Sequence, residues 1–226
     1  MKKIVLAFIL LINTLAFSQS HELGLVIGGS NYIGDIGSGK FISPNDLAFG
    51  ALYRLNRSPR HSYRLTYIHY DINASDADSQ VLSIQERGKE FENSINELGL
   101  GIEFSFWDFN LHDTKDKFTP YLYTGLHYAS FKKLYFIGNE LKEEDGSKST
   151  IAIPITVGFK LRIAEKLIVS AEVSAKKTFT DNLDGSNPDD DGGFRSFGNI
   201  YNKDWYVFTG VMLTYTFGKQ PCFCNF

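Results

Sequence analysis

Residues 95–106, INELGLGIEFSF, alternate between two kinds of side chain. Leucine, isoleucine and phenylalanine occupy the even positions from Leu98 to Phe106, whereas glutamate, glycine and serine occupy the odd positions from Glu97 to Ser105. An apolar residue at every second position is typical of a β-strand whose two faces meet different surroundings. The stretch therefore predicts a strand with one apolar face and one face of small and charged groups.

Seven further runs have the same period of two, and helical periodicity of comparable length is absent from the sequence. The eight predicted strands cover roughly residues 21–29, 46–55, 61–70, 94–106, 119–131, 150–163, 166–178 and 204–217. The connections between them alternate between long (30–45, 71–93, 132–149, 179–203) and shorter (56–60, 107–118, 164–165). Long loops at one end and short turns at the other are typical of bacterial membrane barrels. We therefore predict an all-β protein, in which residues 19–217 form an eight-stranded antiparallel transmembrane β-barrel of the outer membrane.

Composition agrees with this prediction and excludes other classes. The chain has 226 residues, of which 43% are hydrophobic, so it is not a disordered protein. A formal net charge of -3 argues against nucleic-acid binding. No internal apolar stretch is long enough for a membrane helix. A soluble β-sandwich is the alternative fold, but its polar face would carry more charge and threonine than the runs show.

Aromatic residues lie near the ends of the predicted strands, where membrane barrels carry aromatic girdles. The predicted girdle residues are Tyr63, Tyr67, Phe104, Phe106, Tyr121, Tyr123, Trp205, Tyr215 and Phe217.

The first 18 residues have the three parts of a secretory signal. Met1–Lys3 is basic, Ile4–Ile12 is apolar, and Ala16-Phe17-Ser18 has small residues at the spacing that signal peptidase requires. We expect cleavage after Ser18, Sec-dependent export, and localisation in the cell outer membrane with its lipid as a partner.

The strand parity turns several charged side chains toward the inside of the barrel. An eight-stranded barrel has an interior that side chains fill, and buried charges persist only when they are paired. We predict an internal salt-bridge network, with a proton or ion path as the alternative. The predicted lumen residues are Arg64, Glu97, Glu103, Lys160, Arg162, Glu172 and Lys176.

Several segments together resemble a known family over nearly the whole predicted mature chain. These segments are residues 21–25, 32–36, 53–60, 87–100, 103–106, 119–121, 152–160, 180–184, 204–210 and 213–217. In order and spacing the set resembles the PorG-like family, which consists of small outer-membrane barrels of the type IX protein secretion system.

This resemblance implies a non-enzymatic role with no cofactor and no small-molecule substrate. The resemblance also implies that the protein links the outer membrane to the periplasmic ring of PorK and PorN. The alternatives are a small outer-membrane pore or adhesin and, third, a lipid-modifying enzyme.

An enzyme would need a nucleophile and a base, and His69, His127 and Ser130 are the candidates. His127 and Ser130 differ in parity, so they cannot share a strand face, and we expect no carboxylate to orient the histidine. The sequence therefore predicts no catalytic site.

The predicted loop 179–203 is acidic, with Asp181, Asp184 and Asp189–Asp191 among glycines. Calcium binds several oxygen ligands on a turning backbone, but the spacing departs from the calcium-loop pattern. We predict no metal site and keep weak calcium binding as an alternative.

Cys222 and Cys224 lie in the tail 218–226, after the last predicted strand. Two cysteines alone cannot hold zinc, but in an oxidising compartment they can form a small disulfide or pair with a partner. Barrel topology places the tail on the periplasmic side. We predict that it forms a partner-contact surface with the turns 56–60 and 107–118.

Overall fold

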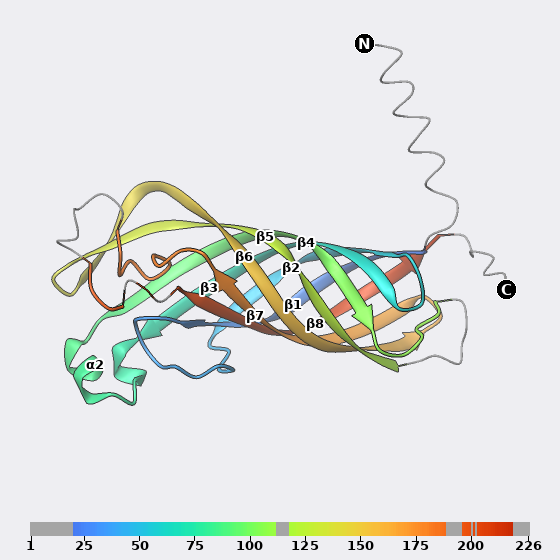
Figure 1. Ribbon diagram of the computed structural model, residues 1–226, viewed down its shortest axis with the longest axis horizontal. Coiled ribbons are helices and arrows are strands. Elements are labelled where there is room, and N and C mark those ends of the chain that lie inside the picture. Colours follow the sequence, from blue (N-terminus) through green and yellow to red (C-terminus); the bar gives the residue numbers. More distant parts are fainter. Residues whose placement is uncertain (1–19, 112–117, 189–195, 200, 202, 219–226) are drawn as a thin grey trace, which may run out of the picture.

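The structure is a computed structural model that describes residues 20–111, 118–188, 196–199, 201 and 203–218 (Figure 1). Eight antiparallel strands pair in chain order, and β8 pairs with β1 to close the barrel. The strands are β1 (Ser20–Ile33), β2 (Asp46–Asn56), β3 (His61–Ser75), β4 (Glu90–Ser105), β5 (Phe118–Ile137), β6 (Glu140–Ala164), β7 (Leu167–Thr178) and β8 (Trp205–Phe217). A 3-10 turn, η1 (Asp76–Asp78), and a short helix, α2 (Leu82–Arg87), lie between β3 and β4. The predicted eight-stranded antiparallel barrel is confirmed.

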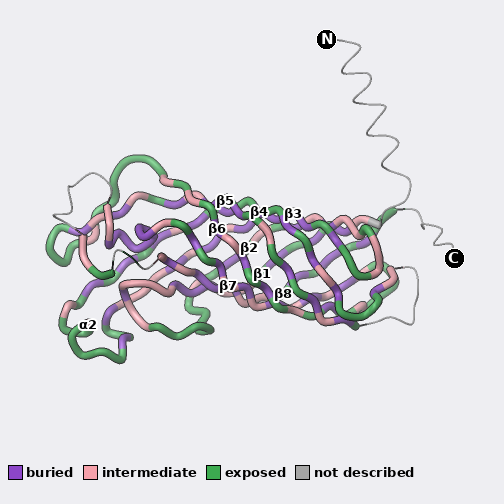
Figure 2. Tube along the Cα trace, viewed as in Figure 1, coloured by how far each residue is buried: buried purple, intermediate pink, exposed green. Residues whose placement is uncertain are grey.

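The two faces of each strand meet opposite surroundings. On β4, Leu98, Leu100 and Ile102 are 52–62% exposed on the outside, whereas Glu97 and Glu103 are fully buried inside. Figure 2 shows this alternation along the strands. A continuous outer band of exposed leucine, isoleucine, valine and aromatic side chains suits lipid and not water. Among the described residues, no helix is long and apolar enough to cross a membrane.

Strands β1, β3, β4, β5 and β6 extend beyond their predicted bounds at one end of the barrel, where α2 also lies (Figure 1). The largest difference is the predicted loop 132–149, which is instead a hairpin of β5 and β6 that turns at Gly138. Gly138 has φ +64, a backbone conformation that favours glycine. Residues 142–150 are polar and mostly exposed, so the apolar alternation that reveals membrane strands is missing there. We assign this end to the cell exterior because long loops of bacterial barrels are extracellular.

The short turns β2–β3 and β6–β7, the start of β1 and the end of β8 lie at the opposite, periplasmic end (Figure 1). There the His21 ring stacks on Phe217, with 5.4 Å between centroids. The predicted signal segment 1–18 lies outside the described residues, as do Cys222 and Cys224.

Side chains fill the interior of the barrel in two zones. Toward the extracellular end, an apolar core includes Phe91, Ile95, Phe131 and Phe208. Toward the periplasmic end, the interior is polar and charged. Tyr121 and Tyr123, predicted for the outer girdle, are buried in this polar zone, because Leu122 holds the lipid-facing parity of β5.

Candidate functional site

Glu103 of β4 is the centre of a buried ionic cluster in the lumen. Its carboxylate lies 2.6 Å from Lys160 Nζ of β6 and 3.1 Å from Arg54 Nη2 of β2. Arg64 Nη1 of β3 is 3.8 Å away. All four side chains are at most 2% exposed, so their charges must compensate one another inside the barrel.

Two further glutamates accept hydrogen bonds from the terminal nitrogens of the arginines. Arg54 Nη1 donates to Glu22 at 2.5 Å, and Arg64 donates to both oxygens of Glu172 at 2.6 and 2.8 Å. Tyr121 Oη also donates to Glu172, at 2.6 Å. The bidentate contact of Arg64 has the geometry that makes arginine–carboxylate pairs strong.

A second cluster surrounds Glu97 of β4. Lys176 Nζ donates to it at 2.5 Å, and His127 Nδ1 lies at 2.9 Å. Tyr70 Oη donates to the same carboxylate at 3.1 Å, and Tyr206 Oη donates to its other oxygen. These five buried residues come from β3, β4, β5, β7 and β8, so the cluster ties distant strands together across the lumen.

The two clusters together form what we call the lumen network. Its charged members are Glu22, Arg54, Arg64, Glu97, Glu103, Lys160, Glu172 and Lys176. Six of the seven residues predicted for the lumen are among them. Four cations face four anions, so the buried network carries no net charge when His127 is neutral.

The seventh predicted residue, Arg162, is half-buried near the periplasmic mouth. It donates to the backbone oxygen of Asn110, and its guanidinium lies 5.3 Å from the centroid of the Phe109 ring. The sequence prediction missed Glu22 and Arg54. Both alternate with outward Leu23 and Tyr53, so the parity rule applied to β1 and β2 would have found them.

Glycines on the inner face make room for the large rings of the network. A Cβ atom on Gly99 would lie 2.5 Å from Nε2 of His127. One on Gly101 would lie 2.7 Å from the Tyr123 ring, and one on Gly158 would lie 2.6 Å from Tyr121. These glycines of β4 and β6 therefore leave the space that the neighbouring rings occupy.

The periplasmic mouth of the lumen is covered by the chain after β4. The backbone N–H of Phe109 donates to the carbonyl of Pro59 at 3.0 Å. This holds the Phe109 side chain, which is 4% exposed, beside the Lys160 ammonium at 5.4 Å. An aromatic face next to a cation is a favourable contact that also excludes water.

The extracellular mouth is covered by the chain between β7 and β8. Leu183 is fully buried, and its N–H donates to Asp204 at 2.9 Å. Tyr32 Oη lies 2.8 Å from Asp184 and 2.5 Å from Asp204. Burial, followed by the charge of Asp184, raises the pKa of Asp204 well above its usual range. Burial, followed by the charge of Asp35, raises the pKa of Asp181 to about 6.

The candidate catalytic residues do not form a catalytic arrangement. His127 lies in the lumen, where Tyr123 Oη is 2.8 Å from its Nε2, while Ser130 has the outward parity of β5. The expectation that no carboxylate would orient His127 was wrong, because Glu97 contacts Nδ1. His69 lies on the outer side of β3, near Asn96 and Asp71.

The described part of the predicted acidic loop 179–203 can be examined for metal ligands. In the described part of the chain, no three His, Cys, Asp or Glu side chains come together in a way that could hold a metal ion. Asp189–Asp191 lie outside the described residues. Asp184 accepts hydrogen bonds from Tyr32 and from the Ser186 N–H.

The fold is similar to that of solved outer-membrane barrels. A major outer membrane protein from Thermus thermophilus has a TM-score of 0.53 and 12% identity, with 88% of this chain and 100% of that chain covered. Ail, the attachment invasion locus protein of Yersinia pestis, in complex with the heparin analogue sucrose octasulfate, has a TM-score of 0.49 and 9% identity, with 89% and 100% covered. Neisserial surface protein A has a TM-score of 0.49 and 9% identity, with 88% and 97% covered.

At these identities the likeness concerns the fold alone. No curated protein sequence matches the chain. The model of one protein family, described as Domain of unknown function (DUF6089), matches residues 1–226. The chain therefore belongs to the DUF6089 family, and its fold is that of an eight-stranded outer-membrane β-barrel.

Proposed function

We propose that this protein is a non-enzymatic outer-membrane component of the type IX secretion system, which it reaches after Sec-dependent export. In this role it anchors or assembles a periplasmic ring of PorK- and PorN-like proteins. The proposal rests on the sequence resemblance to the PorG-like family together with one structural observation, the closed and charge-matched lumen.

The closed lumen supports a role that is carried out by surfaces. The charged half of the lumen is filled by matched ion pairs, Phe109 covers its periplasmic mouth, and Leu183 is buried under the extracellular mouth. Packing of this kind, in the part of the lumen that the structure describes, disfavours passage of a solute. An anchor needs a rigid wall in the membrane and an accessible periplasmic end, and this barrel has both.

The periplasmic end offers side chains suited to a protein partner. Trp107 is 55% exposed beside Phe118, with 5.5 Å between ring centroids. Arg60 Nε lies 2.5 Å from Asp108, and both side chains are at least half exposed. Tryptophan and arginine are the residues most often found at the energetic centres of interfaces. We propose this surface, together with the tail that carries Cys222 and Cys224, as the contact with the ring.

The test is site-specific photo-crosslinking in the native membrane. A photoreactive residue at Arg57 or Trp107 is expected to capture the periplasmic ring proteins, whereas one at Leu82 on α2 is the extracellular control. Ring proteins absent from both periplasmic positions in a folded barrel would contradict the proposal. Deletion of residues 218–226 with no loss of ring recovery would remove the tail from the contact.

A second function, adhesion at the cell surface, is favoured by the long β5–β6 hairpin that extends from the barrel (Figure 1). An adhesin would keep host-cell or matrix binding when the periplasmic surface is altered. Loss of cell binding after shortening the hairpin, with secretion intact, would support adhesion over the secretion role.

A further inference from the structure

The wall of the barrel has an opening on its extracellular side, between β4 and β5. These strands pair only from Ile95↔Phe131 toward the periplasmic end. Beyond that point β4 continues to pair with β3 as far as Ser75↔Glu90, while β5 pairs with β6 as far as Ile137↔Glu140. Residues 90–94 of β4 therefore have a partner strand on one side alone.

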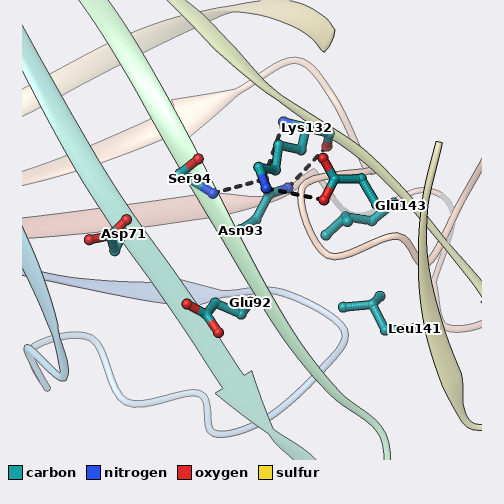
Figure 3. Close-up of a pocket in the computed structure, with 8 residues that line it drawn as sticks. Asp71, Glu92, Asn93, Ser94, Lys132, Leu141 and Glu143 are labelled. Atoms are coloured by element: carbon teal, nitrogen blue, oxygen red, sulfur yellow. Dashed lines mark hydrogen bonds and ion pairs between the residues drawn. The ribbon is translucent and has the colours of Figure 1, made fainter. Parts of the chain in front are cut away.

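The Asn93 side chain closes the bottom of this opening (Figure 3). Its amide donates to the carbonyl of Lys132 at 3.2 Å, and its Oδ1 accepts from the N–H groups of Lys132 at 3.2 Å and Ser94 at 2.8 Å. The carboxamide thus takes the place of a strand backbone for one residue pair. Above it, no strand in the described chain fills the gap.

The backbone of Glu92 faces the opening. The N–H of Ser105 donates to Arg60 on the β3 side, and the N–H of Phe106 donates to Pro120 on the β5 side. Because successive backbone groups of a strand alternate in direction, even-numbered residues of β4 point their N–H and C=O groups toward β5. At Glu92 they point into the gap.

A groove of about 490 Å³ lies along this edge, and Figure 3 shows its lining. Asp71 and Glu92 lie on one side, and Lys132 and Glu143 lie on the other, paired at 3.1 Å. Within the described residues, Glu92 has no ion-pair partner, and Asp71 has the His69 ring at 3.3 Å. Three carboxylates thus face one ammonium, and that ammonium is already paired.

We propose that this groove binds an extended, cationic peptide segment of an extracellular protein, which adds a strand to the free edge of β4. Addition of a strand gains affinity from backbone hydrogen bonds and specificity from alternate side chains. Above Asn93 the free edge comprises residues 90–92, which is about 10 Å of strand. Lysine or arginine at alternate positions of the peptide would reach Asp71 and Glu92.

This inference is independent of the periplasmic role proposed above, because the groove lies at the other end of the barrel. The competing explanation is that Glu90 and Glu92 are charges that protect a free edge from pairing. That explanation predicts that no strand binds.

The experiment uses the full mature protein in lipid nanodiscs and follows backbone amide shifts by NMR. The probes are the heptapeptide KVKVKVK, its acidic counterpart EVEVEVE, and KVKVKVK with every backbone nitrogen methylated, which has no backbone N–H group to donate to the edge of β4. We expect KVKVKVK to shift the amides of Glu92, Ser94 and Leu134 in a saturable way, and the two other peptides to leave them unchanged.

Two double variants distinguish binding in the groove from attraction of the peptide to surface charge in general. D71N with E92Q should weaken binding of KVKVKVK about three- to tenfold, as expected for two exposed charge pairs. D78N with E86Q, which removes two exposed carboxylates near α2, should leave binding unchanged. The proposal is overturned if no shifts occur at millimolar KVKVKVK, if the N-methylated or acidic peptide binds equally well, or if both variants weaken binding alike.

Discussion

Replacing Glu103 by glutamine would test whether matched charges stabilise the barrel. Glu103 accepts from Lys160 at 2.6 Å and from Arg54 at 3.1 Å, with all three side chains buried. At an effective dielectric constant of 20, the Lys160 contact alone corresponds to a gross attraction of about 6 kcal/mol. The cost of desolvating both ions offsets much of this, and removal of one partner of a buried pair typically costs about 3–5 kcal/mol. We expect Glu103→Gln to lower the free energy of unfolding by that amount.

A second substitution separates the loss of charge balance from the loss of one ion pair. Glu103→Gln combined with Lys160→Met removes one anion and one cation, and it leaves Arg54 on Glu22 and Arg64 on Glu172. We expect this double variant to be within about 2 kcal/mol of the parent protein, because apolar replacement of a whole buried ion pair is often nearly neutral.

The measurement is equilibrium urea unfolding in lipid vesicles, followed by the fluorescence of the two tryptophans of the chain. Retention of the compact band on unheated SDS gels reports the folded fraction independently. Asp108→Asn, which breaks an exposed pair with Arg60, is the control and should cost less than about 1 kcal/mol. A single variant as stable as the control, or a double variant no better than the single one, would refute the role of charge balance.

Three further predictions concern the lumen and its mouths. The parent protein should show no steady conductance in planar bilayers. Phe109→Ala should not create a pore either, because the lumen network remains in place. Stable channels from either protein would contradict a closed lumen. Gly99→Ala should cost about 1–3 kcal/mol in unfolding free energy, because the new methyl group meets the His127 ring; unchanged stability would show that the ring moves freely. The pKa values of Asp181 and Asp204 are raised, so the native state binds protons at these groups more tightly than the unfolded chain does. Docking of the extracellular loop should therefore weaken as the pH rises above about 4, the ordinary pKa of an aspartate. For Asp181 this loss continues until the pH passes its raised pKa of about 6. Hydrogen exchange at Leu183, corrected for its intrinsic pH dependence, should accelerate between pH 5 and 8, and Asp204→Asn should flatten this profile.

The sequence could predict which strand residues face the lumen, because that position follows from the alternation of apolar and polar residues. Parity alone placed Glu97, Glu103, Lys160, Glu172 and Lys176 inside the barrel, because lipid on one side of the wall forces an apolar residue at every second position. Where lipid ends, this signal ends as well, and the β5–β6 hairpin was predicted as a loop.

Contacts between strands that are far apart in the sequence could not be predicted from the sequence. The bond from Lys176 to Glu97 depends on the closure of the barrel, and the position of Phe109 over Lys160 depends on how an irregular turn folds. No periodic pattern encodes either contact. The same holds for Asn93, whose role as a substitute strand partner appears only where β4 and β5 separate.

Charge balance in the lumen also explains how the barrel selects one strand register. Sliding β4 by one residue against β3 would move Glu97 and Glu103 to the lipid face and turn leucines inward. Each displaced carboxylate would lose its buried cation and enter hydrocarbon, at a cost of several kcal/mol. A purely apolar lumen would oppose the same slip less strongly, because the slip would then exchange one apolar side chain for another and would expose no charge to lipid. The network therefore discriminates among registers even if its net contribution to stability is small, and the anchoring role that we propose would depend on this discrimination because it needs one fixed periplasmic surface.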